Sequence, residues 1–384
     1  MSWPVVELGS VVSFIGGSQP PKSTFKYELE DGYVRLLQIR DYKSDDNLTY
    51  IPENSTKKFC SKDDVMIGRY GPPVFQILRG LEGAYNVALM KAQPSEKVDR
   101  DYLFYFLKQE KLFRLIDGLS QRTAGQSGVD MDALKAYPML LPPLEEQKRI
   151  AAILAKADSV RRKRQQAIDL ADDFLRSVFL DMFGDPVTNP KGWKQGSFSD
   201  ISVINPKAEK YDDELPVSFV PMPSVSEDSH VLDSSDIRVY SDVKKGFTAF
   251  KEGDVLFAKI TPCMENGKAA IATGLKNGIG FGSTEFHVFR PDNNNYAPFI
   301  YSLIHLPLFR KVAASNFSGA VGHKRVPKDF LSDFKLILPP IELVIKFKNV
   351  FEAVNESKTK FSANTTGSNE LFHSLSQKAF AGEL

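Results

Sequence analysis

A duplicated segment constrains this chain more than any other feature of its sequence. Leu-Pro-Pro-Leu-Glu-Glu-Gln at 141–147 begins a segment of helical character that runs to Phe183 and Gly184. Leu-Pro-Pro-Ile-Glu at 338–342 begins another that runs to Phe380 and Gly382, and the two align without a gap at an offset of 197. A duplication of this size predicts two equivalent modules, and two modules suggest a divided target.

The repeat continues on the N-terminal side of each helical segment. Trp3 aligns with Trp193 and Arg69 with Lys259, both at an offset of 190, so the second copy carries a net insertion of seven residues before its Pro-Pro pair. Each half has short apolar runs bounded by Gly, Pro and Asn, which predict strands, and shorter helices near 102–116 and 298–312. We therefore expect an α+β fold with an internal pseudo-twofold repeat, in which each half ends in one long helix.

The long helices have clear start and stop signals. Proline stands at each entrance, a glutamate lies in the first turn, and glycine follows the last turn. Alternating steps of four and three place Ile150, Leu154, Leu175 and Val178 on one coiled-coil-like stripe. A helix of about forty residues, at about 1.5 Å rise per residue, would be roughly 60 Å long. We expect the stripes of the two helices to pack on each other.

A run of four basic residues, Arg161 to Arg164, interrupts the apolar stripe of the first long helix. In one interpretation these side chains extend to solvent or pair locally with Asp158 and Glu356. In the other, they face DNA phosphate or specify the register of the helix pair. The sequence favours the first and leaves both open.

Bulk composition excludes some classes of protein. A chain of 384 residues with 42% hydrophobic residues is typical of a globular protein with more than one domain. No apolar run approaches the roughly 20 residues of a membrane span, and the N-terminus lacks a basic stretch before an apolar one, so we expect a cytoplasmic protein without a membrane partner. Cys60 and Cys263 are expected to be free thiols.

Catalytic and metal-binding motifs are missing from the sequence. There is no phosphate-binding loop, no His-Glu-x-x-His pair and no nucleophile elbow, and the five histidines are scattered. Gly16 and Gly17 lack the spacing of a glycine-rich cofactor turn. We expect no catalytic residue, no metal site and no cofactor in this chain.

What remains is a pattern suited to nucleic-acid recognition. Arg69 and Lys259 end matching strands, and each precedes a loop that contains proline; basic side chains there suit guanine edges and phosphates. Polar, glycine-rich loops at 121–128 and 316–325 precede the final strand of each half, where exposed loops commonly carry binding function. A solvated strand end and a mobile connector are the plain alternatives. The predicted DNA-contacting residues are Arg69, Tyr70, Arg122, Gln126, Ser127, Lys259, Thr261, His323, Lys324 and Arg325.

The chain resembles the DNA-specificity subunits of type I restriction–modification systems over nearly its whole length. The resemblance is carried by Leu-Pro-Pro-Leu-Glu-Glu-Gln-Lys-Arg-Ile at 141–150, the looser copy at 338–342, Gly-Asp-Val-Leu-Phe-Ala-Lys at 253–259 and Ser-Thr-Glu-Phe-His-Val at 283–288. The second copy departs from the pattern at 343–345, and its polar stretch at 362–368 leaves the regularity of the second helix open.

The resemblance implies four segments. They are a first target-recognition domain at 1–141, a central helical spacer at 142–185, a second target-recognition domain at 186–338 and a distal helical spacer at 339–384. The two spacers would form an antiparallel pair.

The resemblance also implies a function. The chain would read a bipartite, asymmetric site on double-stranded DNA without catalysing a reaction. Methyltransferase subunits, expected as two copies, would bind S-adenosylmethionine and methylate adenine. A restriction subunit would act as a motor that uses ATP and Mg²⁺. The alternatives are a stand-alone DNA methyltransferase or nuclease, and an interaction scaffold with no role on DNA.

Overall fold

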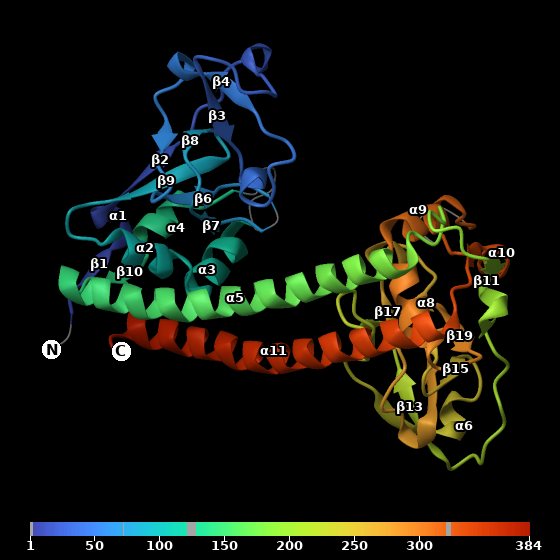
Figure 1. Ribbon diagram of the computed structural model, residues 1–384. Coiled ribbons are helices and arrows are strands. Elements are labelled where there is room, and N and C mark those ends of the chain that lie inside the picture. The colour runs from blue at the N-terminus through green and yellow to red at the C-terminus, as the bar shows by residue number, and fades with distance from the viewer. Residues whose placement is uncertain (1–2, 72, 121–127, 320–323) are drawn as a thin grey trace. The chain divides into compact units, whose positions relative to one another are not determined.

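The structure is a computed structural model that describes residues 3–71, 73–120, 128–319 and 324–384, and of residues 362–366 the backbone alone. The chain forms two compact units (Figure 1). Unit 1 consists of Met1–Gln165 and Ala363–Leu384, and unit 2 consists of Gln166–Ser362. Each unit therefore contains part of both long helices. The four segment boundaries expected from the sequence stay a prediction.

Unit 1 is built on two four-stranded sheets and one two-stranded ribbon. The first sheet has the order β2 (Val12–Gly16), β9 (Leu89–Pro94), β6 (Val65–Gly68) and β7 (Gln76–Leu78), all antiparallel. The second has the order β4 (Tyr50–Pro52), β3 (Tyr33–Leu37), β8 (Gly83–Tyr85) and β5 (Phe59–Cys60), with β3 and β8 parallel. The ribbon pairs β1 (Val5–Glu7) with β10 (Pro138–Leu140). All four residues of β6 are buried, as expected for a central strand.

Helices cover the first sheet of unit 1. They are α2 (Arg100–Leu107), α3 (Glu110–Ser120) and α4 (Met131–Ala136), with the short elements α1 (Leu8–Val11), η1 (Lys22–Thr24), η2 (Ile39–Tyr42) and η3 (Glu53–Ser55). Asp99 and Asp130 cap α2 and α4 by accepting hydrogen bonds from two backbone N–H groups each. The helical region expected near 102–116 is thus two helices, because the chain turns after α2 and the Gln109 side chain donates to the Phe106 carbonyl.

Unit 2 repeats this architecture. One sheet has the order β12 (Ser202–Ile204), β19 (Phe286–Pro291), β16 (Val255–Ala258) and β17 (Ala269–Ile271). The other has the order β14 (Asp236–Val239), β13 (Pro216–Val220), β18 (Ile279–Gly282) and β15 (Thr248–Lys251), and β11 (Gln195–Ser197) pairs with β20 (Lys335–Ile337). The helices are α8 (Tyr296–His305), α9 (Pro307–Ser315) and α10 (Lys328–Asp333). The short elements are η4 (Phe198–Asp200), η5 (Met222–Ser224), α6 (Tyr240–Val243), α7 (Cys263–Asn266) and η6 (Lys276–Gly278).

The repeat expected from the sequence is confirmed by the matching strand orders of the two units. Strand β6 matches β16 at an offset of 190, whereas β9 matches β19 at an offset of 197. The seven additional residues therefore lie between β16 and β19, in comparison with the segment between β6 and β9. Part of this segment forms α7, which directly follows the loop after β16. This segment also reaches the core, because Met264 of α7 is fully buried in the main cluster of unit 2.

The long helices are α5 (Leu144–Phe183) and α11 (Ile341–Ala381). In unit 1 the start of α5 packs on the end of α11, with Ile150, Leu154 and Phe372 in one buried cluster. In unit 2 the end of α5 packs on the start of α11, with Phe179 and Phe347 in another. The pairing is antiparallel, as expected. The backbone of α11 stays helical through 362–368, so its polar stretch does not interrupt the helix.

The structure explains why the first Pro-Pro motif contains a glutamine. Gln147 is fully buried, and its amide donates to the carbonyls of Pro142 and Lys97 while its oxygen accepts from the N–H of Asp99. This amide ties the first turn of α5 to the entrance of α2. The equivalent residue in unit 2 is the buried Val344, which packs in the core instead.

Candidate nucleic-acid interface

In unit 1 the predicted strand-end cation lies at a junction of several loops. The Arg69 N–H donates to the Ala88 carbonyl at 2.8 Å, and the Arg69 carbonyl accepts from the Val129 N–H at 3.2 Å. The guanidinium carbon lies 5.3 Å from the centre of the Tyr70 ring, in cation–π geometry. Within the described residues, its Nε is buried and has no hydrogen-bond partner. These contacts hold Arg69 in place, and within the described ranges no carboxylate pairs with its guanidinium.

The glycine pair at 16–17 has a steric role at this junction. A Cβ on Gly17 would lie 2.0 Å from the Asn86 carbonyl oxygen, a distance that no side chain tolerates. The backbone approach is fixed by two hydrogen bonds, from the Gly17 N–H to the Leu89 carbonyl and from the Ser18 N–H to the Tyr85 carbonyl. A Cβ on Gly16 would lie 3.8 Å from the Arg69 guanidinium. The pair thus brings the loop after β2 beside Arg69.

Unit 2 repeats the junction around Lys259. The Lys259 N–H donates to the Glu285 carbonyl at 2.9 Å, and the Lys259 carbonyl accepts from the Val326 N–H at 2.9 Å. These bonds match those of Arg69, because Ala88 and Val129 align with Glu285 and Val326 at an offset of 197. The structure therefore joins two features that the sequence placed separately: the strand-end cation and the polar loop before the final strand.

The other predicted residues of unit 2 lie at the same junction. The Thr261 N–H donates to the Lys324 carbonyl at 3.1 Å, and Lys324 is exposed. Arg325 exchanges backbone hydrogen bonds of 2.9 Å with Ser318, and its guanidinium makes two bonds of 2.8 Å to the Glu285 carboxylate. The Arg325 guanidinium holds the pKa of Glu285 below its usual value. Arg122, Gln126, Ser127 and His323 were also predicted and lie outside the described residues.

Sequence reasoning missed a buried histidine beneath this junction. The Nε2 of His287 donates to the Val326 carbonyl at 2.8 Å, and its Nδ1 accepts from the Asn205 amide at 3.0 Å. Burial lowers the pKa of His287 to about 4, so the ring is neutral at pH 7. The signal available in the sequence was the motif at 283–288, which contains both Glu285 and His287.

Comparisons with known proteins match both halves of the chain to one family. The profile of the family described as "Type I restriction modification DNA specificity domain" matches residues 1–170 and 190–360. The chain belongs to this family. The two matches cover both halves of the internal repeat.

Relatives and solved structures of the family resemble the chain to different degrees. It is 38% identical to the type I restriction enzyme EcoEI specificity subunit of Escherichia coli over 204 residues, which cover 52% of the chain and 32% of that protein. It is 35% identical to the EcoAI specificity subunit of the same organism over 246 residues, covering 61% of the chain and 39% of that protein. The chain thus spans well under half the length of these relatives. The type I system S subunit of M. genitalium shares the fold, with a TM-score of 0.56, 13% identity and coverage of 99% and 96% of the two chains.

Within unit 1, the basic run of α5 at Arg161 to Arg164 makes local contacts. Arg161 and Arg162 lie 2.7 Å and 3.3 Å from the carboxylate of the buried Asp158. Arg161 also lies 5.2 Å from the Phe372 ring centre, and Arg164 contacts Ser368 on α11. Glu356, the other expected acid, pairs with Lys360 instead. These contacts favour local pairing for the described part of the run.

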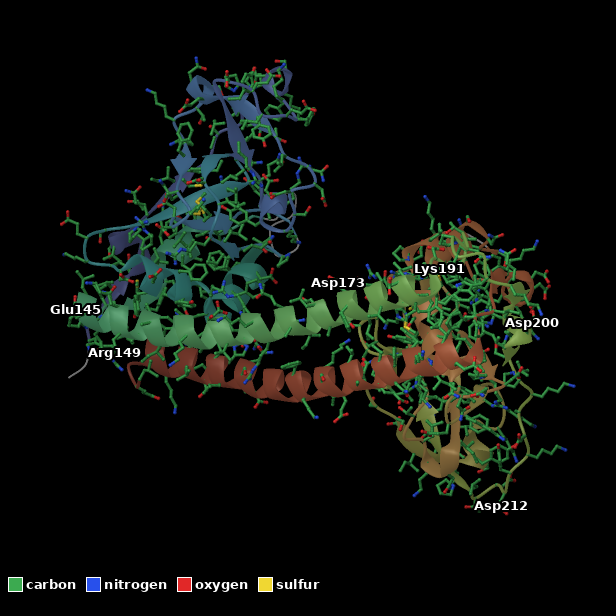
Figure 2. The ribbon with its side chains drawn as sticks, in the orientation of Figure 1. Glu145, Arg149, Asp173, Lys191, Asp200 and Asp212 are labelled. Carbon is green, nitrogen blue, oxygen red and sulfur yellow. The ribbon has the colours of Figure 1, made fainter. Side chains whose placement is uncertain are left out.

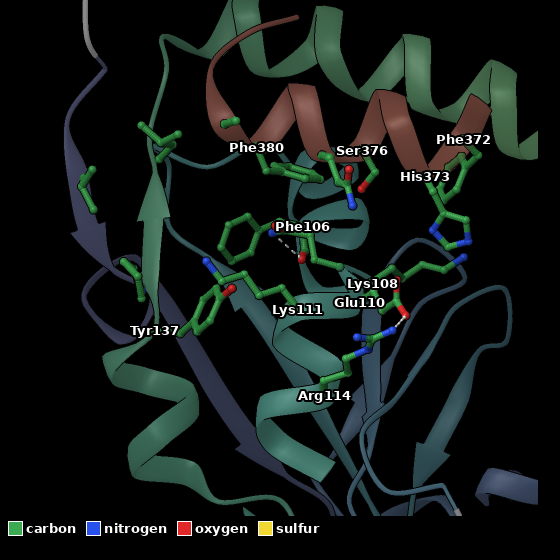
Figure 3. A pocket seen from close by; sticks show the side chains of 16 residues that line it. Phe106, Lys108, Glu110, Lys111, Arg114, Tyr137, Phe372, His373, Ser376 and Phe380 are labelled. Atoms are coloured by element: carbon green, nitrogen blue, oxygen red, sulfur yellow. Dashed lines mark hydrogen bonds and ion pairs between the residues drawn. The ribbon is translucent and has the colours of Figure 1, made fainter. Parts of the chain in front are cut away.

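Unit 1 also contains a groove that the sequence did not indicate (Figure 3). Its volume is about 690 Å³. Phe372, His373, Ser376 and Phe380 of α11 face residues of α2, α3 and the β1–β10 ribbon across it. The cations on its rim are Lys108, Lys111 and Arg114. The carboxylate on the rim, Glu110, is paired with Arg114, so the groove has an apolar floor and a net positive rim.

A smaller hollow of about 270 Å³ occupies the matching place in unit 2. His305 lines this hollow at the position that corresponds to Lys108 in the unit 1 groove, at an offset of 197. Arg176 likewise corresponds to His373. Its lining includes three carboxylates, Asp172, Glu227 and Asp228. The duplication therefore produced two hollows of different charge.

The described residues offer neither a metal site nor a membrane span. No group of three or more His, Cys, Asp or Glu side chains is placed to hold a metal within the described ranges. Among the same residues, no helix is long and apolar enough to cross a bilayer.

Proposed function

We propose that the chain is the DNA-reading subunit of a type I restriction–modification complex. Each unit would read one part of a bipartite, asymmetric DNA site, and partner subunits would methylate adenine and cut DNA. The observation that carries this proposal is the repeated junction, in which Arg69 and Lys259 are held by matching pairs of backbone hydrogen bonds. Two such junctions in one chain of this family suit a DNA site with two parts.

The chemistry of the junctions supports contact with DNA. Arginine and lysine donate to the O6 and N7 atoms of guanine in the major groove and to phosphates. Arg69 has no carboxylate partner among the described residues, and Lys324 is exposed beside Lys259. The flanking loops add hydroxyl and amide groups that can donate to base edges. A rigid backbone beneath exposed donors is what sequence discrimination requires.

Catalysis would belong to the partners. In this proposal a methyltransferase subunit binds S-adenosylmethionine, and a restriction subunit uses ATP and Mg²⁺. The target adenine would be flipped out of the duplex for methylation, as enzymes that modify bases require. A cytoplasmic location is part of the same proposal, because the DNA and the methyltransferase would be there.

Two methyltransferase copies would dock on the helical parts of the chain. Phe174 on α5 and Leu371 on α11 align at an offset of 197, and both side chains are more than half exposed. Each follows an exposed acidic residue, Asp173 and Glu370; Figure 2 labels Asp173 on α5. An exposed apolar side chain beside an acid, repeated once in each unit, suits two equivalent contacts with one kind of partner.

Methylome sequencing of cells with and without this chain would test the proposal. We expect methyladenine at a motif of two short specified parts separated by an unspecified gap, and its loss when the chain is deleted. Arg69→Ala should relax one part and Lys259→Ala the other. A continuous motif would contradict the two-part reading. Binding of S-adenosylmethionine and methylation by the purified chain alone would favour a stand-alone methyltransferase.

A further inference from the structure

Two bidentate ion pairs bracket the antiparallel strands β16 and β19 of unit 2. At one end Arg290 donates to the two oxygens of Asp254 at 3.0 and 2.8 Å. At the other end Arg325 donates to the two oxygens of Glu285 at 2.8 Å each. Only the second pair lies at the Lys259 junction. The first lies before β16, at the opposite end of the strand.

The pair at the junction joins three segments of chain. Glu285 accepts the Lys259 N–H through its backbone carbonyl, and Arg325 is paired through its backbone with Ser318. The residue after Arg325 donates its N–H to the Lys259 carbonyl. The side-chain contact therefore adds to the backbone bonds that join the strand end, the residue before β19 and residues 324–326. A guanidinium used in this way commits its Nε and Nη2 donors to the carboxylate.

Unit 1 repeats the backbone of the junction but not this contact. Ala88 and Gly128 occupy the positions of Glu285 and Arg325, while the backbone bonds of Arg69 remain. The Tyr70 ring fills the space instead, because a Cβ on Gly128 would lie 3.2 Å from it. The hydrogen bonds common to both units thus hold the junction together without an ion pair, and Glu285–Arg325 is an addition specific to unit 2.

The Glu285–Arg325 pair positions the chain segments that it joins and contributes little to the stability of unit 2. The side chains of Arg325 and Glu285 are 41% and 24% exposed, and ion pairs open to solvent stabilise proteins little. Bidentate guanidinium–carboxylate contacts instead fix a planar arrangement of both groups. Such a contact can set the spacing between the loops that carry Thr261 and Lys324 without dominating the free energy of folding.

We propose that Glu285 is a positioning residue for sequence recognition by unit 2. By holding Arg325, it sets the distance between the Lys259 loop and residues 324–326, and hence which bases this unit accepts. The inference rests on the proposed function, because it concerns the half-site read by unit 2.

Methylomes and binding constants of the assembled complex would test the inference. In Glu285→Gln the carboxylate is replaced by an amide of the same shape, and in Arg325→Lys the charge is kept but the planar fork is lost. We expect both variants to relax the half-site of unit 2 and to leave that of unit 1 unchanged. The preference of unit 2 for its cognate base should fall on the order of 10-fold, which is comparable to the loss of one bidentate base contact.

Asp254→Asn provides the matched control in the same pair of strands. It removes the charge from the other bidentate pair, so it should lower the thermal midpoint of unit 2 and leave the motif unchanged. An unchanged motif in Glu285→Gln and Arg325→Lys would overturn the proposal, and so would an equal loss at both half-sites that follows the thermal midpoint.

The salt dependence of binding separates positioning from phosphate contact. If Arg325 bound phosphate, Arg325→Ala would reduce the slope of log K against log salt by about 1, because one fewer counterion would be released. Positioning predicts a relaxed motif with an unchanged slope. If the unaltered chain directed no bipartite methylation, the proposed function would fail whatever the behaviour of Glu285.

Discussion

The carboxylate of Asp158 accepts a hydrogen bond of 2.7 Å from Arg161, although only 1% of the Asp158 side chain is exposed. Arg162 lies 3.3 Å from the same carboxylate and Lys108 lies 3.8 Å from it. Burial lowers the pKa of Lys108, and the nearby Asp158 opposes this effect. One buried acid therefore joins α5 to the end of α2 and compensates several cations.

Loss of this carboxylate should destabilise unit 1. The cations that lose their partner keep 27–66% of their side-chain surface exposed, so water can solvate them in part, and Asp158→Asn should lower the free energy of unfolding by about 1–2 kcal/mol. The chain has two tryptophans, Trp3 in unit 1 and Trp193 in unit 2, so fluorescence in a Trp193→Phe background would follow unit 1 during denaturation. Lys156→Gln, at an exposed position of α5 within unit 1, is the control and should change stability by less than about 0.5 kcal/mol. Equal effects of the two substitutions would contradict this assignment.

Arg69 should contribute to base discrimination through the shape of its guanidinium as well as its charge. Arg69→Ala in the assembled complex should weaken binding to the cognate site by about 1–3 kcal/mol and relax one position of one half-site. Arg69→Lys keeps the charge but loses the two parallel donors, so it should recover affinity more than specificity. Arg79→Ala is the control, because Arg79 pairs with Asp101 and not at the junction. Binding titrations on DNA with single base changes would measure both quantities, and an unchanged preference in Arg69→Ala would remove Arg69 from the interface.

Local signals predicted the long helices and the repeat, because their causes lie close together in the sequence. Proline at 142–143 and glycine at 184 bracket α5 as expected, and matching spacings revealed the second copy. The strand ends at Arg69 and Lys259 were also predicted from a short apolar run before a polar loop. These features need only the residues on either side of them.

The contacts within the junctions could not be predicted, because they join residues far apart in the chain. The partner of Arg325 is Glu285, forty residues earlier, and nothing in the spacing of the two indicates an ion pair. The burial of His287 depends on Asn205 and Val326, which lie on other elements. The unit 1 groove likewise requires the end of α11 beside α2 and α3. Tertiary packing decides each of these features.

The rim of the unit 1 groove should contribute to binding of a methyltransferase subunit. Lys111→Glu reverses one charge on a rim where Glu110 is already paired with Arg114. We predict that the partner segment is acidic, so this variant should bind one methyltransferase copy more weakly. Lys311→Glu is the matched control: Lys311 is exposed and aligns with Arg114 at an offset of 197, but does not line the unit 2 hollow. Native mass spectrometry of the assembled complex would count the bound copies. Equal binding to both variants would exclude the groove as a docking surface.

Mild acid should destabilise unit 2 more than unit 1. Burial lowers the pKa of His230, His287 and His305 to about 4, and all three lie in unit 2. A histidine with a folded pKa below its unfolded value near 6.5 stays neutral in the folded state while the unfolded chain takes up a proton. Each such histidine therefore leaves the free energy of unfolding unchanged well above pH 6.5. As the pH falls from 6.5 toward about 4, it lowers the free energy of unfolding by up to roughly 1.4 kcal/mol per pH unit.

Unit 1 should behave differently over the same range. His373, the one histidine of its described residues, is exposed. Burial raises the pKa of Asp41 in unit 1, and a carboxyl with a raised pKa becomes less unfavourable in the folded state as the pH falls. Denaturation between pH 7 and pH 5, followed through Trp193 in a Trp3→Phe background and through Trp3 in the reverse one, would compare the units. We expect a loss of stability in unit 2 that His287→Gln makes less steep, because the amide can still donate to the Val326 carbonyl without titrating; a parallel loss in both units would show that these histidines do not cause it.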